Sequence, residues 1–430
     1  MKYDSLEKLQ NGGTVAVIGG GPAGASCAIA LKNLAREKGI GINVVLYEGK
    51  NFSVGKQYNQ CAGVLSPPID KILEDYLDVP FPRKLVQRTI DGYMLHGARN
   101  EVDLVREGEV SYALRRITFD DYLLNQVVMR GVKVVSARVT ELEFYSDCVR
   151  VYSEGDHLRA DVVVGAFGCD DGTTQVFSKQ TSYRPPSLIY SIVTNVHPGD
   201  EHMQSFGNRI HAFLPGVSKI EFGAITPKRN HLTINIAGKH VDARMMQTFL
   251  SLKPLRELLP PEFPTYQDKL NIFKGKFPSG KASGIYGDRY ITIGDATGLL
   301  RPFKGKGVNT GVITGYYAAR VIIEHGISAA AFQKFREYCA GYFDDMNYGK
   351  VFRILAIIGT KLRMLDNIME LAKSESVINN LLFDAVSAHR SYHDILNYVG
   401  NPRTIFKLTS AGLGGVFKRN YHINPSQPRT

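Results

Sequence analysis

The chain has 430 residues, too many for one ordinary hydrophobic core and about right for two or three packed units. Hydrophobic residues make up 44% of the sequence and charged residues 22%, which excludes a wholly disordered chain. The 52 Lys and Arg against 41 Asp and Glu give a net charge of +11, but the basic residues come as isolated pairs. A nucleic-acid-binding surface needs a dense basic stripe, so we expect no nucleic-acid partner.

The five cysteines are scattered and contain no C-x-x-C pair, which argues against a disulfide framework and against a structural zinc site. The first residues hold no apolar signal-peptide core, and the sequence has no run of about 18 apolar residues. We therefore expect a cytoplasmic protein with no metal ligands.

Residues 14–18 are a β-branched run that predicts a strand and ends directly in Gly19-Gly20-Gly21-Pro22-Ala23-Gly24. Residues 25–38 predict a helix, and residues 42–47 predict a second apolar strand that ends at Glu48. The segment is typical of a βαβ unit of about 35 residues.

The glycine spacing in this unit is that of a dinucleotide-binding loop. Gly19 permits the tight turn, Gly21 lets the backbone approach a pyrophosphate, and Gly24 lets the helix pack close to the strand. Glu48 can accept hydrogen bonds from both ribose hydroxyls, and its charge would repel the 2′-phosphate of NADP. A glycine turn with an acid placed by chance is the alternative.

The next part of the chain has weaker signals. Residues 52–110 are rich in Pro and Gly and predict irregular structure. Residues 118–129 predict a helix, and residues 133–143 and 149–152 predict antiparallel strands. Residues 161–166, DVVVGA, predict a buried strand.

From about residue 180 to residue 275 the pattern predicts strands, with a helical insert at about 241–258. Residues 290–293 predict another strand, which ends in Gly294-Asp295. A glycine-rich loop then leads into a predicted helix over residues 308–325.

The chain continues as predicted helices to about residue 398. Residues 346–430 hold 11 Lys and Arg against 5 Asp and Glu, together with an apolar helical periodicity. Both a solvated basic helical cap and attraction to a membrane surface explain this pattern. Peripheral membrane contact is therefore one of our expectations for this region.

The second glycine segment decides between NAD and FAD. A flavin dinucleotide needs a carboxylate for its ribityl hydroxyls, a role that we assign to Asp295. It also needs backbone donors near the pyrimidine edge of the ring, which the segment Gly307-Val308-Asn309 can present at a helix N-terminus. The two motifs together predict bound FAD.

These blocks resemble the flavoproteins of the p-hydroxybenzoate hydroxylase type, and among them the geranylgeranyl reductase family. The resemblance covers residues 14–325 and depends on VIGGGPAGASCAIAL, on RRITFDDYL with the following GVKVV, and on GDATGLLRPFKGKGVNTG. It implies an α/β fold. A Rossmann-like FAD-binding domain would be interleaved with an antiparallel-sheet substrate domain and followed by a helical C-terminal region.

We divide the chain accordingly. The FAD-binding domain is predicted in three parts, at residues 1–75, 111–178 and 276–345. The substrate domain is predicted at residues 76–110 and 179–275, and the helical C-terminal region at residues 346–430.

The resemblance also implies roles for single residues. The residue that matches Arg116 lies along the flavin in such proteins, and Cys61-Ala62-Gly63 looks like the Cys-Gly-Gly segment beside the isoalloxazine ring. Cys61 is thus a candidate to tune the ring or to donate a proton, with a small buried structural residue as the alternative. Tyr58, three residues earlier, is an alternative proton donor.

The predicted site residues form two groups. The catalytic candidates are Cys61 and Tyr58. The predicted cofactor-binding residues are Gly19, Gly21, Pro22, Ala23, Gly24, Glu48, Gly63, Arg116, Val139, Gly294, Asp295, Gly305, Gly307, Val308 and Asn309.

The chain departs from the family in two places. Gly165-Ala166-Phe167-Gly168 stands where the family has Gly-Ala-Asp-Gly, which removes a contact near the pyrophosphate and the nicotinamide approach. The electron donor therefore stays unidentified. Residues 219–228 keep only Pro227 and Lys228 of an aromatic segment along the lipid channel, so the substrate can differ. Flavin-dependent halogenases need a tryptophan motif, and the chain has no Trp.

We expect an FAD-dependent oxidoreductase that transfers hydride from reduced flavin N5 to a carbon–carbon double bond of an isoprenoid or other apolar substrate. A flavin-dependent monooxygenase that hydroxylates a small molecule is the alternative, because the same fold serves both reactions. A flavoprotein that relays electrons to a partner without small-molecule turnover is a third possibility.

Overall fold

The computed structural model of the chain describes residues 8–50, 61–217, 219–263, 270–301, 306–361 and 364–400. Of the predicted site residues, Tyr58 and Gly305 lie outside these ranges.

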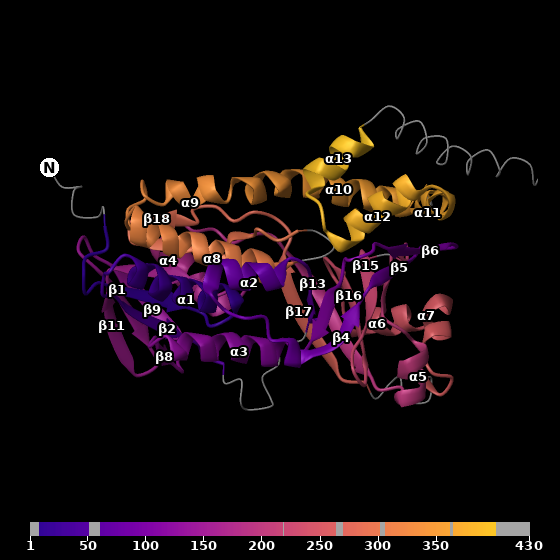
Figure 1. Cartoon of the computed structure of the whole chain (residues 1–430), viewed down its shortest axis with the longest axis horizontal. Coiled ribbons are helices and arrows are strands. Elements are labelled where there is room, and N and C mark those ends of the chain that lie inside the picture. The colour runs from indigo at the N-terminus through magenta and orange to yellow at the C-terminus, as the bar shows by residue number, and fades with distance from the viewer. Residues whose placement is uncertain are drawn as a thin grey trace, which may run out of the picture.

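One end of the molecule is built on a largely parallel sheet with the strand order β18-β19-β12-β1-β2-β8 (Figure 1). The parallel pairs run from β19 to β8, and β18 joins the edge antiparallel. Its strands are β1 (Thr14–Ile18), β2 (Asn43–Tyr47), β8 (Lys133–Val135), β12 (Val162–Gly165), β18 (Tyr286–Gly287) and β19 (Tyr290–Thr292).

Both faces of this parallel sheet are covered, as the continuous apolar runs of its strands predict. In β1, Val15 and Val17 pack toward helices α1 (Pro22–Glu37) and α8 (Gly307–Glu324). Ala16 belongs to the core on the opposite face. That face is covered by an antiparallel sheet of β9 (Val139–Phe144), β10 (Val149–Ser153) and β11 (Asp156–Ala160).

Helices α1 and α8 pack side by side at close range. A Cβ atom on Gly315 would lie 2.6 Å from the carbonyl oxygen of Ala23, so only glycine fits at this contact. The close approach brings the N-termini of both helices to the carboxyl edge of the parallel sheet, where their free N–H groups and dipoles favour an anion.

The other end of the molecule is built on a mixed sheet with the order β17-β13-β16-β15-β14-β5-β6 (Figure 1). All neighbouring strands are antiparallel except β14 and β5. Its strands are β5 (Gly92–His96), β6 (Glu101–Val105), β13 (Leu188–Val196), β14 (Arg209–Phe213), β15 (Phe222–Pro227), β16 (Leu232–Gly238) and β17 (Ile272–Pro278).

Alternation along these strands gives the mixed sheet two different faces. Ile234 and Ile236 of β16 face a core with α6 (Ala243–Leu250) and α7 (Lys253–Leu258). The opposite face packs against the C-terminal helices α11 (Met364–Ser374) and α12 (Ser376–Ser387). Short connecting elements complete this end, namely α5 (Asp200–Ser205), β3 (Val64–Leu65), β4 (Val86–Ile90) and β7 (Ser111–Leu114).

The two sheets interleave along the sequence, because β5 and β6 join strands that follow 80 or more residues later. Helices α2 (Ile69–Leu77), α3 (Arg116–Met129) and α4 (Asp171–Gln180) flank the parallel-sheet end. The interleaved α/β fold agrees with the predicted class, and the exact domain boundaries stay a prediction.

Two expectations about local structure are wrong. Residues 133–143 do not form one strand, because β8 joins the parallel sheet beside β2 and β9 turns away to pair with β10. Residues 61–110 are not irregular, since they form α2 and several strands. The Pro and Gly residues there mark the turns between short elements rather than the absence of structure.

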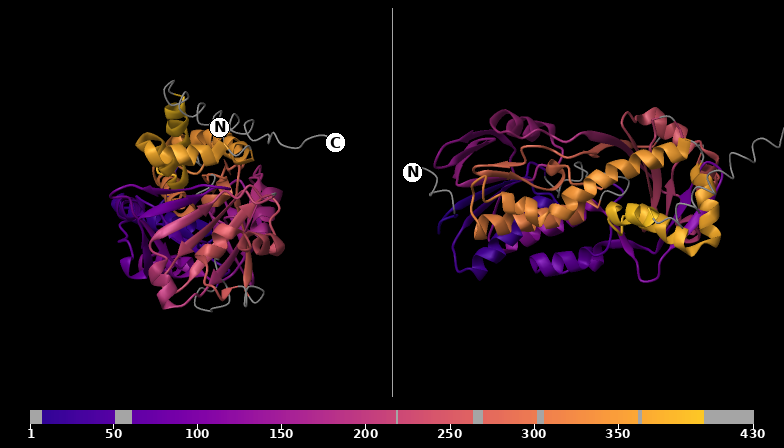
Figure 2. Two further views of the ribbon diagram at one scale, coloured as in Figure 1. Left: turned by 90° about the vertical axis from the view of Figure 1, so that its right-hand side faces the viewer. Right: turned by 90° about the horizontal axis from the view of Figure 1, so that it is seen from above.

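The C-terminal helices cross over both ends of the molecule (Figures 1 and 2). The long helix α10 runs from the parallel-sheet end to the mixed-sheet end, where α11 and α12 lie against the mixed sheet. These helices are α9 (Gln333–Tyr338), α10 (Ala340–Lys361), α11 (Met364–Ser374), α12 (Ser376–Ser387) and α13 (Tyr392–Val399). Within the described ranges, no helix has both the length and the apolar character needed to cross a bilayer.

Candidate functional site

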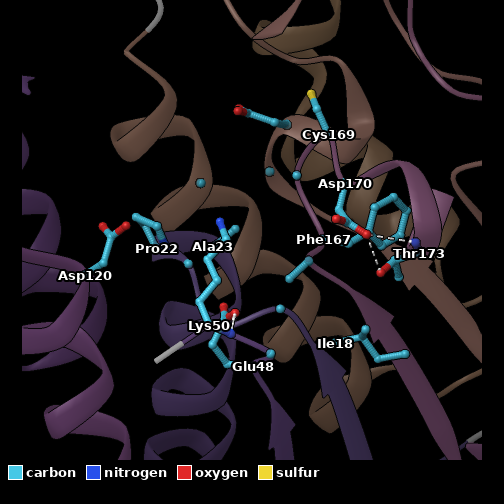
Figure 3. Close-up of a pocket in the computed structure, with 18 of the residues that line it drawn as sticks. Ile18, Pro22, Ala23, Glu48, Lys50, Asp120, Phe167, Cys169, Asp170 and Thr173 are labelled. Atoms are coloured by element: carbon cyan, nitrogen blue, oxygen red, sulfur yellow. Dashed lines mark hydrogen bonds between the residues drawn. The ribbon is translucent and has the colours of Figure 1, made fainter. Parts of the chain in front are cut away.

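A polar cavity of about 410 Å³ lies at the carboxyl ends of β1, β2 and β12. Figure 3 shows its labelled side chains, which come from the ends of these strands and the loops after them, from the start of α1, and from α3 and α4. Ligands bind at this edge in doubly wound sheets, because the strand order reverses there and helix N-termini converge. We call it the polar cavity.

The three predicted glycines have different surroundings in the polar cavity. Gly19 has φ +110°, and a Cβ there would lie 2.4 Å from the carbonyl oxygen of Ala166. A Cβ on Gly24 would lie 1.8 Å from the carbonyl oxygen of Gly19, so the helix packs against its own loop. A Cβ on Gly21 would meet no protein atom within 4 Å, because Gly21 lines the open cavity. Gly21 is thus the glycine that leaves room for a ligand.

Glu48 is held at the edge of the same cavity. Its Oε2 accepts a hydrogen bond from the N–H of Gly20 at 2.8 Å, and its Oε1 accepts one from the N–H of Lys50 at 2.8 Å. These bonds fix the carboxylate without using all of its acceptor sites. The remaining sites fit the two hydroxyls of a ribose.

Several lining residues of the polar cavity were not predicted from the sequence. Arg138 and Lys50 bring positive charge, and Asp170 caps α4 by accepting the N–H of Thr173 at 2.9 Å. Phe167, which replaces the family's Asp, packs on Phe177 with ring centroids 4.8 Å apart. Lys50 follows β2, Arg138 lies just before β9, and Phe167 and Asp170 follow β12, so three separate segments bring these side chains together.

A second cavity of about 380 Å³ lies between the mixed sheet and the C-terminal helices. Most of its lining side chains are apolar, so we call it the apolar cavity. It shares Arg116, Asp295, Gly307 and Val308 with the polar cavity, so the two cavities meet at these residues. A dinucleotide in the polar cavity would therefore end at the entrance to the apolar one.

Arg116 lies at this junction in an ion pair. Its guanidinium contacts Asp120 Oδ1 at 3.0 Å, and the two side chains are 14% and 3% exposed. Burial disfavours the charged form of Arg116, but the Asp120 carboxylate and the Cys61 thiol outweigh it and raise its pKa above the ordinary value. Burial also raises the pKa of Asp295, which Arg116 partly opposes. The junction thus holds a permanent cation.

Cys61 lies beside that cation, with Sγ 4.0 Å from Nη1 of Arg116. It lines the apolar cavity together with Ala62 and Gly63. The sequence identified no basic neighbour for this thiol, and the fold supplies Arg116 from 55 residues away. The arrangement places a proton-bearing group at the entrance to the apolar cavity.

The fold brings a second cation, Lys228, behind the same segment. Its Nζ donates to the carbonyl oxygen of Leu114 at 2.9 Å, and a Cβ on Gly63 would lie 2.8 Å from that nitrogen. Lys228 is 4% exposed, and no ion pair joins it to a carboxylate among the described residues. Burial lowers its pKa to about 8, although Cys61 opposes the shift.

We expect Lys228→Met to remove a pH dependence of stability. Between about pH 8 and pH 10.5 the unfolded chain keeps the Lys228 proton that the folded chain has lost, so the free energy of unfolding rises with pH. Over this whole pH range, Lys228 changes the free energy of unfolding by on the order of 3 kcal/mol. Urea unfolding at pH 7 to 10.5 measures the difference between wild type and variant, which cancels the contributions of Tyr and Cys. An equal slope in both proteins would contradict the assignment.

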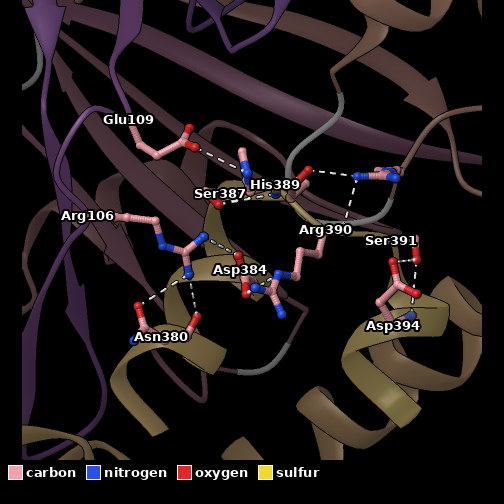
Figure 4. A network of polar contacts seen from close by, with 11 residues as sticks. Arg106, Glu109, Asn380, Asp384, Ser387, His389, Arg390, Ser391 and Asp394 are labelled. Carbon is pink, nitrogen blue, oxygen red and sulfur yellow. Dashed lines mark hydrogen bonds and ion pairs between the residues drawn. The ribbon is translucent and has the colours of Figure 1, made fainter. Parts of the chain in front are cut away.

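The apolar cavity is roofed by α10, α11 and α12, and a charged network fixes this roof (Figure 4). Arg106, just after β6, contacts Asp384 of α12 at 2.6 Å, and Arg390 contacts the same carboxylate at 3.3 Å. His389 lies 3.1 Å from Glu109. Because Asp384 is only 5% exposed, removing one partner would leave a buried charge. The network thus ties the roof to the mixed sheet.

The predicted site residues are brought together at the two cavities, with few exceptions. Those that line the polar cavity are Gly19, Gly21, Pro22, Ala23, Glu48, Arg116, Val139, Gly294, Asp295, Gly307 and Val308. Those that line the apolar cavity are Cys61, Gly63, Arg116, Asp295, Gly307, Val308 and Asn309. Gly24 lies under the loop and lines neither cavity, while Tyr58 and Gly305 lie outside the described residues.

The fold is shared with solved structures of a geranylgeranyl bacteriochlorophyll reductase-like protein, a flavin-dependent brominase and a peptidyl tryptophan dihydroxylase. No family model matches the chain. A geranylgeranyl diphosphate reductase of Synechocystis is 22% identical over 94% of this chain and 98% of its own length. A digeranylgeranylglycerophospholipid reductase of Methanothrix thermoacetophila is 25% identical over 72% and 77%. The resemblance to geranylgeranyl reductases is confirmed by these relatives.

Solved structures share the fold at low identity. A geranylgeranyl bacteriochlorophyll reductase-like protein of Thermoplasma acidophilum has a TM-score of 0.62 and 17% identity, covering 93% of this chain and 99% of its own. A flavoprotein/dehydrogenase of Cytophaga hutchinsonii has a TM-score of 0.68 and 17% identity, covering 94% and 100%. A flavin-dependent brominase has a TM-score of 0.61 and 17% identity, covering 90% and 98%. The predicted fold class is thus confirmed.

Proposed function

We propose that the protein is an FAD-dependent oxidoreductase that reduces a carbon–carbon double bond of an isoprenoid or similarly apolar substrate. The supporting observation is the meeting of the polar and apolar cavities at Arg116 and Asp295. The polar cavity opens there onto a cavity with a mostly apolar lining, which suits a hydrocarbon chain. Relatives named as reductases support an oxidoreductase.

The residues of the polar cavity fit FAD. The N-terminus of α1 with Gly21 would hold the pyrophosphate, Glu48 the ribose, and Asp295 the ribityl hydroxyls. The N-terminus of α8, at Gly307 to Asn309, would hold the pyrimidine edge of the ring. Bound reduced FAD supplies a hydride, and the protein's own contribution is to orient the chain and to deliver a proton.

Cys61 is the proposed proton donor. It lines the apolar cavity at the end where the two cavities meet, so it can reach a substrate carbon beside the flavin site. Arg116 beside the thiol would stabilise the negative charge that remains after proton transfer. A Cys61→Ser variant that keeps full activity would remove this role.

A flavin-dependent monooxygenase is the second candidate. Halogenases and a peptidyl tryptophan dihydroxylase share the fold, which supports the class but not a choice between the reactions. The apolar lining of the second cavity favours reduction of a hydrocarbon chain over hydroxylation of a small polar molecule.

An anaerobic experiment decides between the two. The flavin is reduced, a geranylgeranyl lipid is added without oxygen, and the oxidised-flavin visible band is followed. Return of the band means that the lipid accepts the electrons and supports the reductase. No change, followed by a transient peroxide-like spectrum when air is admitted, would favour the monooxygenase. A protein that cannot be loaded with FAD would refute both.

We also propose that α10 contacts a membrane surface from which the substrate enters. Val351, Ile354, Leu355 and Ile358 recur at helical spacing and are 49%, 57%, 54% and 47% exposed. Two neighbours on the same helix, Phe352 and Ala356, line the apolar cavity. The described residues between 346 and 400 include 5 basic and 5 acidic residues, so apolar area rather than net charge supports the contact.

The double variant Ile354→Glu with Ile358→Glu is expected to bind phosphatidylcholine vesicles about tenfold more weakly in a flotation assay. Two apolar side chains can then no longer be buried in the membrane surface. Val128→Glu is the matched control, since Val128 is 53% exposed on α3, on the opposite side of the molecule (Figure 1). Equal flotation of the variants and wild type would contradict the proposed contact.

A further inference from the structure

We call the mixed-sheet wall of the apolar cavity its floor, and Asn235 is a polar residue there that the proposed function does not use. Asn235 lies in the middle of β16, and its side chain lines the cavity. Its Oδ1 is buried and receives no hydrogen bond from any residue that the structure describes. Such an atom normally costs about 1–3 kcal/mol unless a ligand or water supplies a donor.

The two residues directly opposite Asn235 on the neighbouring strands are apolar. Across the mixed sheet, Asn235 lies opposite Val193 of β13 and Ala224 of β15. Ala224 in turn lies opposite Ala212 of β14. These small side chains leave a depression beside the amide, because neither of the cross-strand alanines extends beyond Cβ. A substrate group can reach Asn235 there, between two apolar cross-strand neighbours, while Ser191 and Thr226 also line the cavity.

The charges of the apolar cavity are elsewhere. Its described charged lining residues are Arg116, Asp295 and Lys306, which lie at or next to the junction with the polar cavity. Arg116 is paired with Asp120, and Lys306 donates to the carbonyl oxygen of Pro67 at 3.2 Å. A phosphate or carboxylate beside Asn235 would therefore be desolvated without a cation from these residues, which is unfavourable. The floor therefore suits an uncharged hydrogen-bond donor of the substrate.

We propose that Asn235 is a specificity-determining residue that accepts a hydrogen bond from a hydroxyl group of an otherwise apolar substrate. The inference rests on the proposed function and narrows its substrate class. The substrate would be an alcohol rather than a plain hydrocarbon or a diphosphate. The hydroxyl is anchored on β16, and the chain extends toward Cys61 and the junction of the cavities. Anchoring one end selects which double bond lies at the junction.

The test is equilibrium binding to the oxidised, FAD-loaded protein, read from the flavin spectrum and from tyrosine fluorescence. The probes are geranylgeraniol, its methyl ether, which cannot donate, and geranylgeranyl diphosphate. Wild type is expected to bind the alcohol at least about tenfold more tightly than the ether. In Asn235→Leu the alcohol and the ether are expected to bind within about twofold of each other, because the acceptor is gone.

Ile210→Val is the matched control, since Ile210 lines the same floor and offers no hydrogen bond. It should change the affinities for alcohol and ether equally. An alcohol preference that persists in Asn235→Leu, a wild type without that preference, or tightest binding of the diphosphate would overturn the inference. So would a loss of FAD in Asn235→Leu, because the amide would then serve the cofactor.

The outcome is separable from that of the proposed function. Asn235-dependent binding of the alcohol, with no anaerobic reoxidation of reduced flavin by it, would refute the reductase and leave the hydroxyl site standing. If both the alcohol and the ether reoxidise the reduced flavin and bind with equal affinity, the reductase is supported and the role of Asn235 is refuted.

Discussion

Gly21→Ala is expected to lose FAD affinity by at least tenfold while the apoprotein keeps its stability. Gly21 has φ −67°, which alanine adopts without strain, and a Cβ there meets no protein atom within 4 Å. The added methyl group instead occupies the polar cavity where the backbone must approach the pyrophosphate. The measurement is FAD titration of the apoprotein, together with its thermal unfolding midpoint.

Two other glycines supply the comparison. Gly24→Ala should fail to fold, because its Cβ would lie 1.8 Å from a backbone oxygen that cannot move aside without displacing the loop. Gly341→Ala, in helix α10, has an unobstructed Cβ and should bind FAD normally. If Gly21→Ala binds FAD like wild type, the ligand does not lie against this loop.

Arg116→Met is expected to destabilise the fold by about 3 kcal/mol, because Asp120 would stay buried without its guanidinium partner. It should also lower the flavin reduction potential, since the permanent cation at the junction of the cavities disappears. Urea unfolding measures the first effect and a spectroscopic redox titration the second.

The double variant Arg116→Met with Asp120→Asn separates the two roles. Neutralising both partners should restore most of the stability, because no uncompensated buried charge remains. The reduction potential and the turnover should stay low, since the cation beside the flavin site is still missing. Full recovery of turnover in the double variant would mean that Arg116 acts only in folding.

The local motifs of the chain were sufficient to predict part of the lining of the polar cavity. Gly19, Gly21 and Glu48 lie within one βαβ unit, where the period of the strands and the glycine spacing depend on neighbours in sequence. Asp295 and Gly307 belong to a second local motif at a strand end and a helix start. Such motifs can be recognised in a single sequence because a few adjacent residues decide turns and helix starts.

The apolar cavity could not be predicted in this way. Asn235 and Lys228 have no motif, and their roles depend on which strands pair and which face of the mixed sheet each side chain takes. A shift of one residue in register would turn Asn235 into the core under α6.

The sequence by itself determined the first βαβ unit and its glycine loop, since these depend on short-range backbone geometry. Only the tertiary structure decided the apolar cavity, the contact of Arg116 with Cys61 and the unbonded side-chain oxygen of Asn235. Cys61 and Arg116 are 55 residues apart, and the surroundings of Asn235 depend on which strands pair. Such contacts are tertiary packing and electrostatics that leave no local pattern.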